Sequence, residues 1–162
     1  MATNATLCFV VRKGEVLLLL KSVGRFGGGL WNGLGGKLGD DETPLECVKR
    51  EVLEESDLEI DNPKRHGTLE FRFGDDAERD WVVQVFSATD FRGEPRSSDE
   101  GALRWFALRD IPYDQMWEDD RHWLPLLLRG ASFRGYFRFD SEGKKIVSYD
   151  LVEGPEDSLP EA

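Results

Sequence analysis

Residues 36–58, GKLGDDETPLECVKREVLEESDL, constrain the structure of this chain more than any other segment. Thr43 suits the N-cap of a helix and Pro44 suits its first helical position. Glu46 stands where it can close a capping box with Thr43. The segment therefore predicts a helix over residues 44–56.

The predicted helix carries an acidic stripe beside an apolar one. Glu51, Glu54 and Glu55 fall within about 100° of one another. The apolar stripe next to them holds Leu45, Val48 and Val52. Carboxylates at this spacing repel by about 0.2–0.5 kcal/mol per pair unless a cation lies among them. Such oxygen ligands suit Mg²⁺, which commonly takes one or two carboxylates plus substrate phosphates. Taken alone, the stripe favours a solvated acidic face, because charge runs usually face solvent.

Length and composition indicate one small domain. A chain of 162 residues can bury a hydrophobic core without support from disulfide bonds or metal ions. Cys8 and Cys47 are expected to be reduced, buried thiols. The start lacks the pattern of a secretory signal, and no apolar run reaches the ~20 residues of a membrane span, so we expect a cytoplasmic protein. The formal charge of −11 argues against binding to a nucleic-acid polymer or an anionic membrane. Nothing demands more than a monomer.

Patterning along the chain predicts a mixed α/β fold. Apolar, β-prone runs predict strands over residues 6–12, 15–20, 67–73, 81–89, 102–108, 133–139 and 145–151. A second helix is predicted over residues 119–128. Strands with helices at two separate places suit an α/β/α sandwich on a mixed sheet, in one domain over residues 1–152. The acidic tail, residues 153–162, carries two prolines and is expected to be disordered.

A fixed spacing of several residues adds a family resemblance. Gly36, five residues, Glu42, seven residues, residues 50–55 (REVLEE) and then Leu58 resemble the Nudix box, the signature of the Nudix hydrolases. The resemblance implies the Nudix α/β/α sandwich. Asp57 departs from the family's glycine, which would serve as a left-handed helix terminator. Asp adopts that conformation less readily, so we expect a small loss of stability.

The resemblance extends over about residues 5–152. L-W-N-G-L-G-G-K, R-W-F, M-W-E-D-D and F-R-G-Y-F-R-F, in this order with the box, look like the MutT-homologue branch of the family. That branch hydrolyses oxidised purine nucleoside triphosphates, so the resemblance implies release of a monophosphate and pyrophosphate from substrates such as 8-oxo-dGTP and 2-hydroxy-dATP.

The resemblance also implies which residues form the catalytic part of the active site. Its metal ligands would be Glu51, Glu54, Glu55, Glu100 and the carbonyl oxygen of Gly35, with Mg²⁺ as cofactor and Mn²⁺ as an alternative. Arg50 would orient the glutamates. Glu54 and Glu100 both stay candidates for the base that activates water. Lys21, and more weakly Lys37, would meet the phosphates; the glycines before Lys37 do not form a nucleotide-binding P-loop.

The resemblance further implies a pocket that binds the purine base. Asn32, Asp119 and Asp120 would read the purine edge, and Trp117 would stack on the ring. Two adjacent aspartates in an apolar cleft would push at least one toward the protonated form. Asp119 equally suits a helix cap. The remaining expected pocket residues are Thr6, Phe26, Leu34, Gly35, Gly36, Phe71, Phe73, Trp81, Glu118 and Trp123, of which Leu34, Trp81 and Glu118 differ from the residues of the animal enzymes.

Three alternatives remain open. Another Nudix hydrolase, acting on dinucleoside polyphosphates, nucleotide sugars or unmodified dNTPs, would share the box and differ in the pocket. A binding module without catalysis is disfavoured, because such modules typically lose box glutamates and all four are present here: Glu42, Glu51, Glu54 and Glu55. An acidic structural domain without a ligand is the third.

Overall fold

The fold is built on one large mixed sheet. The computed structural model describes residues 2–75 and 80–155. Its strands are β1 (Thr3–Arg12), β2 (Glu15–Lys21), β3 (Trp31–Asn32), β4 (Leu34–Lys37), β5 (Glu59–Asp61), β6 (Lys64–Phe73), β7 (Trp81–Ala88), β8 (Asp90–Arg92), β9 (Gly101–Ala107), β10 (Phe133–Phe139) and β11 (Ile146–Glu153). The main path of the sheet is β11-β10-β6-β7-β1-β2-β3, with β4 on β1 and β9 on β2. β1 and β7 are parallel, as are β6 and β10, whereas β5 and β8 form a separate pair.

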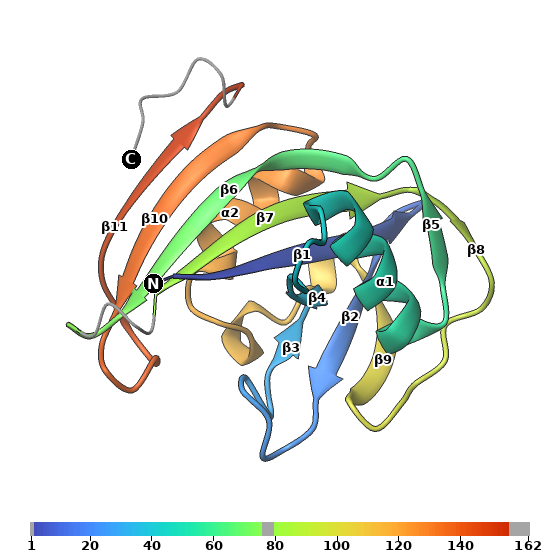
Figure 1. The fold of residues 1–162 in the computed structure, drawn as a ribbon, viewed down its shortest axis with the longest axis horizontal. Coiled ribbons are helices and arrows are strands. Elements are labelled where there is room, and N and C mark those ends of the chain that lie inside the picture. Colours follow the sequence, from blue (N-terminus) through green and yellow to red (C-terminus); the bar gives the residue numbers. More distant parts are fainter. Residues whose placement is uncertain (1, 76–79, 156–162) are drawn as a thin grey trace.

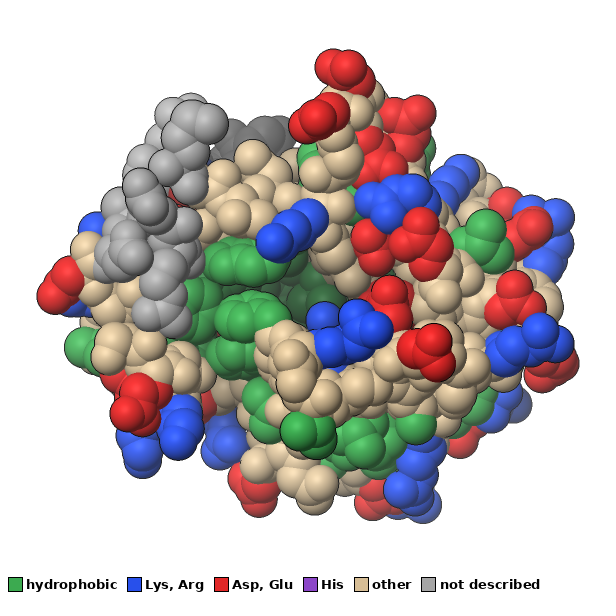
Figure 2. Space-filling view, turned by 60° about the horizontal axis from the view of Figure 1, so that its bottom comes forward, with side chains coloured by type: hydrophobic (Ala, Val, Ile, Leu, Met, Phe, Trp, Pro, Cys, Tyr) green, Lys and Arg blue, Asp and Glu red, His purple; other side chains and the backbone are tan. Residues whose placement is uncertain are grey.

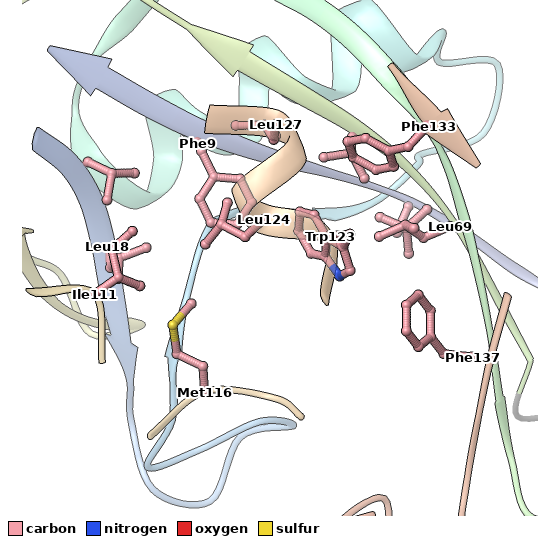
Figure 3. Packing of buried hydrophobic residues seen from close by; sticks show 14 of the residues in the cluster. Phe9, Leu18, Leu69, Ile111, Met116, Trp123, Leu124, Leu127, Phe133 and Phe137 are labelled. Atoms are coloured by element: carbon pink, nitrogen blue, oxygen red, sulfur yellow. The ribbon is translucent and has the colours of Figure 1, made fainter. Parts of the chain in front are cut away.

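Two α-helices cover opposite faces of this sheet (Figure 1). The helix α1 (Pro44–Ser56) lies over one face and α2 (Asp120–Leu128) over the other. Successive side chains of β1 point to opposite faces of the sheet and pack in two hydrophobic cores. Phe9 packs in the core under α2, called the α2 core, and Val10 packs in the core under α1, called the α1 core. Figure 3 shows Phe9 and Trp123 in the α2 core. The predicted α/β/α architecture on a mixed sheet is confirmed.

The helix α1 has the predicted limits and caps. Thr43 Oγ1 accepts a 3.1 Å hydrogen bond from the N–H of Glu46, and the N–H of Thr43 donates a 2.9 Å bond to Glu46 Oε1. At the other end Asp57 adopts the left-handed conformation with φ 64°, and its N–H donates to the carbonyl of Leu53. The capping box and the left-handed Asp57 are therefore confirmed.

The glycine-rich stretch before α1 is more ordered than its sequence indicates. The strands β3 and β4 were not predicted, because Gly and Asn have low β propensity. Gly35 pairs with Leu7 across β4 and β1, and a Cβ at Gly35 would lie 2.0 Å from the carbonyl oxygen of Thr6. The backbones of β4 and β1 therefore approach so closely at this point that only glycine fits.

The start of the second helix and the end of the last strand differ from their predicted positions. The helix α2 begins at Asp120, and Asp119 before it makes no side-chain capping bond. β11 continues to Glu153, which pairs with Arg129 at 2.7 Å, so the strand includes the first residue of the expected tail. Residues 156–162 lie outside the described residues.

Both cysteines fit the expectation. Cys8 and Cys47 are free and buried. None of the helices in the described part of the chain is long and apolar enough to cross a membrane.

Candidate active site

A cavity of ≈ 280 Å³ opens between β1, β4, β6, β7 and the start of α2. Figure 2 shows a hollow with hydrophobic side chains on its walls and charged side chains along one side. Residues far apart in the sequence line it: Ala5, Thr6, Leu7, Lys21, Phe26, Asn32, Gly33, Gly35, Gly36, Lys37, Phe71, Phe73, Trp81, Val83, Trp117, Asp119, Asp120, Trp123 and Phe139. An apolar pocket with a few convergent polar groups is typical of a small-molecule site.

Aromatic rings form the walls. Phe26, from the loop between β2 and β3, stacks on Trp81 with ring centroids 5.5 Å apart and planes at 3°. Its centroid lies 5.3 Å from that of Trp117, which in turn contacts Phe73 at 6.0 Å. Lys37 Nζ lies 5.6 Å from the centroid of the Trp81 ring. These flat apolar faces suit a planar heteroaromatic ring.

Polar groups gather at one edge of the cavity. Trp117 Nε1 donates a 3.1 Å hydrogen bond to Asn32 Oδ1, and Trp123 Nε1 donates a 2.7 Å bond to Asp119 Oδ2. Burial raises the pKa of Asp119 to about 6, and burial together with the charge of Asp119 raises the pKa of Asp120 well above its usual value. A carboxyl accepts when ionised and donates when protonated, so this edge can offer both functions to a ligand.

Arg50 organises the acidic side of α1. Its Nε and Nη2 donate to the two carboxylate oxygens of Glu42 at 2.7 and 2.9 Å. Its Nη1 donates to Glu51 Oε1 at 2.8 Å and to Glu54 Oε2 at 3.2 Å. These bonds from Arg50, with the N–H of Gly39, lower the pKa of Glu42 to about 2. Arg50 thus links three box glutamates, which agrees with the orienting role expected for it.

Glu55 joins α1 to the cavity. Its side chain is 1% exposed, and its Oε1 accepts a 2.7 Å hydrogen bond from the N–H of Gly35, a cavity residue. Burial, with a smaller contribution from Glu100, raises the pKa of Glu55 to about 8, although the Gly35 N–H and Lys21 act in the opposite direction. Burial raises the pKa of Glu51 as well, with contributions from Glu54 and Glu100. The glutamates therefore influence one another electrostatically.

The donor set fits a divalent cation in its chemistry. Carboxylates that raise one another's pKa are stabilised in their charged form by a cation among them, and all are hard oxygen donors. Within residues 2–75 and 80–155, no three His, Cys, Asp or Glu side chains are gathered closely enough to hold a metal ion. In this conformation Arg50 engages Glu51 and Glu54, and Gly35 engages Glu55.

Most residues expected in the pocket meet in this cavity. Two do not: Leu34 and Glu118. Leu34 is fully buried in the core under α1, and Glu118 Oε1 accepts a 3.0 Å hydrogen bond from the N–H of Ile146. Five lining residues were not predicted from the sequence, namely Ala5, Leu7, Gly33, Val83 and Phe139. Alternation along the strand did not indicate Ala5 and Leu7, because the side chain of the expected Thr6 lies on the opposite face of β1, against Cys47.

Comparison with known proteins agrees with this geometry. Residues 1–127 match the NUDIX domain. The chain is 43% identical to the oxidized purine nucleoside triphosphate hydrolase of Danio rerio over 91% of this chain and 93% of that one, and 42% identical to the protein of the same name from Mus musculus over the same shares. A MutT protein from Bacillus halodurans superimposes with a TM-score of 0.82 at 30% identity, covering 92% of this chain and 97% of that one.

Proposed function

The chain belongs to the Nudix family of hydrolases, and from this premise we propose that it hydrolyses oxidised purine nucleoside triphosphates to a monophosphate and pyrophosphate. One observation carries the proposal. Gly35 lines the aromatic cavity and at the same time binds Glu55 of α1 through its N–H. A base held in the cavity would therefore have its phosphate chain directed toward the glutamates.

Recognition of the base would use the aromatic walls of the cavity and the polar groups at its edge. A purine would stack on Trp117, whose indole N–H fixes the Asn32 amide. Asp119 and Asp120 would pair with the edge of the base. A protonated carboxyl can donate to a ring nitrogen or carbonyl oxygen, and an ionised one can accept from the N–H that oxidation creates. This versatility supports acceptance of both oxidised guanine and oxidised adenine.

Glutamates would supply the metal ligands and the base. Glu51, Glu54, Glu55, Glu100 and the carbonyl oxygen of Gly35 are the proposed ligands of Mg²⁺, or of Mn²⁺ in its place. When bound, such an ion neutralises charge that develops on phosphate oxygens and lowers the pKa of water. Glu54 or Glu100 would take the proton from the attacking water.

Other residues would orient the reacting groups. Arg50 would position Glu51 and Glu54 through the bonds that it donates to them. Lys21, in the cavity wall, would contact the phosphates, with Lys37 a weaker candidate. Holding the triphosphate in line with the water supplies much of the rate enhancement in reactions of this type.

A steady-state panel tests the proposal. Normal and oxidised dNTPs and NTPs, dinucleoside polyphosphates and nucleotide sugars are compared with Mg²⁺ present, and pyrophosphate release is measured. We expect the highest kcat/KM for an oxidised purine triphosphate, loss of turnover on chelation, and recovery on adding Mg²⁺. A preference for unmodified dNTPs or for another nucleoside diphosphate derivative would contradict the substrate assignment and leave the hydrolase class intact.

The proposal includes a small-molecule substrate, no nucleic-acid polymer, no membrane, a monomeric state and a cytoplasmic location. Light scattering after gel filtration at working concentration measures the oligomeric state, and a dimer mass would refute the monomer.

A further inference from the structure

Glu118 stands between two parts of the base pocket without lining it. It follows Trp117 and precedes Asp119, both of which line the cavity. Its own side chain turns away and accepts the N–H of Ile146, the first residue of β11, at 3.0 Å. This bond joins the pocket segment to a strand 28 residues further along the chain.

Ile146 closes a tightly bonded hairpin turn between β10 and β11. Asp140 Oδ1 accepts the N–H of Lys144 at 2.9 Å, and the carbonyl of Asp140 accepts the N–H of Gly143 at 3.0 Å. The N–H of Asp140 donates to the carbonyl of Lys145 at 2.9 Å. Because these bonds fix the turn internally, it can move as one unit with the start of β11.

The tip of the turn rests against the walls of the cavity. A Cβ placed on Gly143 would lie 3.3 Å from the Phe73 ring and 3.5 Å from the Trp117 ring, and Gly143 has φ +73°. The backbone of the turn therefore lies next to both rings, with no room between them for more than a single carbon atom. A shift of the hairpin would change the packing on one side of both rings.

We propose that Glu118 is a positioning residue for base recognition, which acts by holding the hairpin turn against Trp117 and Phe73. The backbone at the start of α2 supplements it, since the N–H of Asp120 donates to the carbonyl of Trp117 at 3.1 Å. Glu118 thereby sets where the stacking ring and the two aspartates stand, although it does not touch the ligand. This role rests on the proposed function.

Two variants separate the hydrogen bond from the charge. Glu118→Ala removes both, whereas Glu118→Gln removes the charge and keeps an oxygen that accepts the Ile146 N–H. For Glu118→Ala we expect KM for the oxidised substrate to rise about three- to tenfold, the range of one lost hydrogen bond, with kcat within about twofold of wild type. Glu118→Gln is expected to restore KM. Glu142→Ala, in the same turn and paired only loosely with Lys144 at 3.9 Å, is the matched control and should leave KM unchanged.

Exchange of the Ile146 amide proton in the ligand-free protein gives a readout that does not need turnover. Exchange should accelerate in Glu118→Ala and stay slow in Glu118→Gln. Equal KM in the wild type and Glu118→Ala would overturn the inference, and so would an equal rise of KM in both Glu118 variants. If the wild type hydrolyses a different nucleotide of the panel, the proposed function fails, and the same KM comparison on that nucleotide still decides the role of Glu118.

Discussion

The indole N–H of Trp117 donates a 3.1 Å hydrogen bond to the amide oxygen of Asn32, 85 residues away in sequence. Asn32 Nδ2 donates in turn to the carbonyl of Leu30 at 2.9 Å. Both ends of the amide are thereby oriented, and one N–H and one oxygen lone pair stay available at the cavity. The stacking residue and the polar residue of the pocket therefore act as one unit.

Replacing Trp117 by Phe should separate stacking from this orientation. The variant keeps an aromatic face and loses the donor to Asn32, so the amide can rotate. We expect kcat/KM for the oxidised substrate to fall about tenfold and the ratio of oxidised to normal dGTP turnover to fall with it. Steady-state kinetics on both nucleotides measures the effect. An unchanged ratio would show that Asn32 does not need Trp117.

Replacing Glu54 or Glu55 by Gln should abolish turnover while the fold survives. The amide oxygen that Glu55→Gln introduces can still accept the Gly35 N–H, so the link from α1 to the cavity remains. We expect kcat to fall by about 10²–10⁴-fold in each variant. Circular dichroism checks the fold, and Glu94→Gln, at an exposed position, is the control. Near-normal kcat in both variants would refute the metal assignment.

Replacing Arg50 by Lys should lower kcat more than stability. Lys keeps the positive charge and cannot make the two-pronged contact with Glu42 while reaching Glu51 and Glu54. We expect a fall in kcat of about tenfold or more and a change in melting temperature of a few degrees. Equal kcat for Arg50→Lys and the wild type would mean that charge alone suffices.

Asp119 should make the stability fall as pH rises. Its pKa is raised to about 6 in the folded protein, above its unfolded value, so unfolding releases a proton between roughly pH 4 and 6. The stabilising contribution is full below the unfolded pKa and is lost as pH rises through 6. Asp119→Asn removes this titration, and its amide oxygen can still accept the Trp123 N–H.

Urea unfolding from pH 4.5 to 7.5 measures this difference. The free energy of unfolding of Asp119→Asn should increase relative to wild type with rising pH. Asp114→Asn, at an exposed carboxylate paired with Arg121, should follow the wild-type profile. Parallel curves for Asp119→Asn and wild type would contradict the raised pKa.

Asp57→Gly should stabilise the protein. Asp57 holds φ 64° at the C-cap of α1, where glycine has no steric cost. Part of the gain is lost to the greater freedom of glycine in the unfolded chain, so we expect about 0.5 kcal/mol. Chemical denaturation measures it, and Asp57→Ala should be less stable than wild type. A destabilised Asp57→Gly would show that the Asp side chain itself supports the cap.

Local interactions explain what the sequence predicts well. The helix α1 has the expected limits because Thr43 and Glu46 cap it over three residues, and the glutamate stripe follows from helix geometry. β10 also has its expected limits, since Phe and Gly on one face alternate with Arg and Tyr on the other, which leaves one apolar face. The box motif, likewise local, indicates the hydrolase family without any tertiary contact.

Contacts between distant segments decided the rest. Leu34 and Gly35 are neighbours, yet one is buried under α1 and the other lines the cavity, because β4 takes its register from β1. Nothing within that short glycine-rich strand fixes which way its residues face. Glu118 likewise sits among pocket residues and bonds to β11 instead.

The sequence by itself therefore determined the helix and its acidic face, since these depend on residues three or four apart, and the box over residues 36–58 indicated the kind of chemistry. The tertiary structure decided which side chains meet at the base, how Trp117 fixes Asn32, and how Gly35 links the cavity to Glu55. Those contacts join residues 20 and 85 positions apart, and only the packing of the sheet against its two helices brings them within hydrogen-bonding distance.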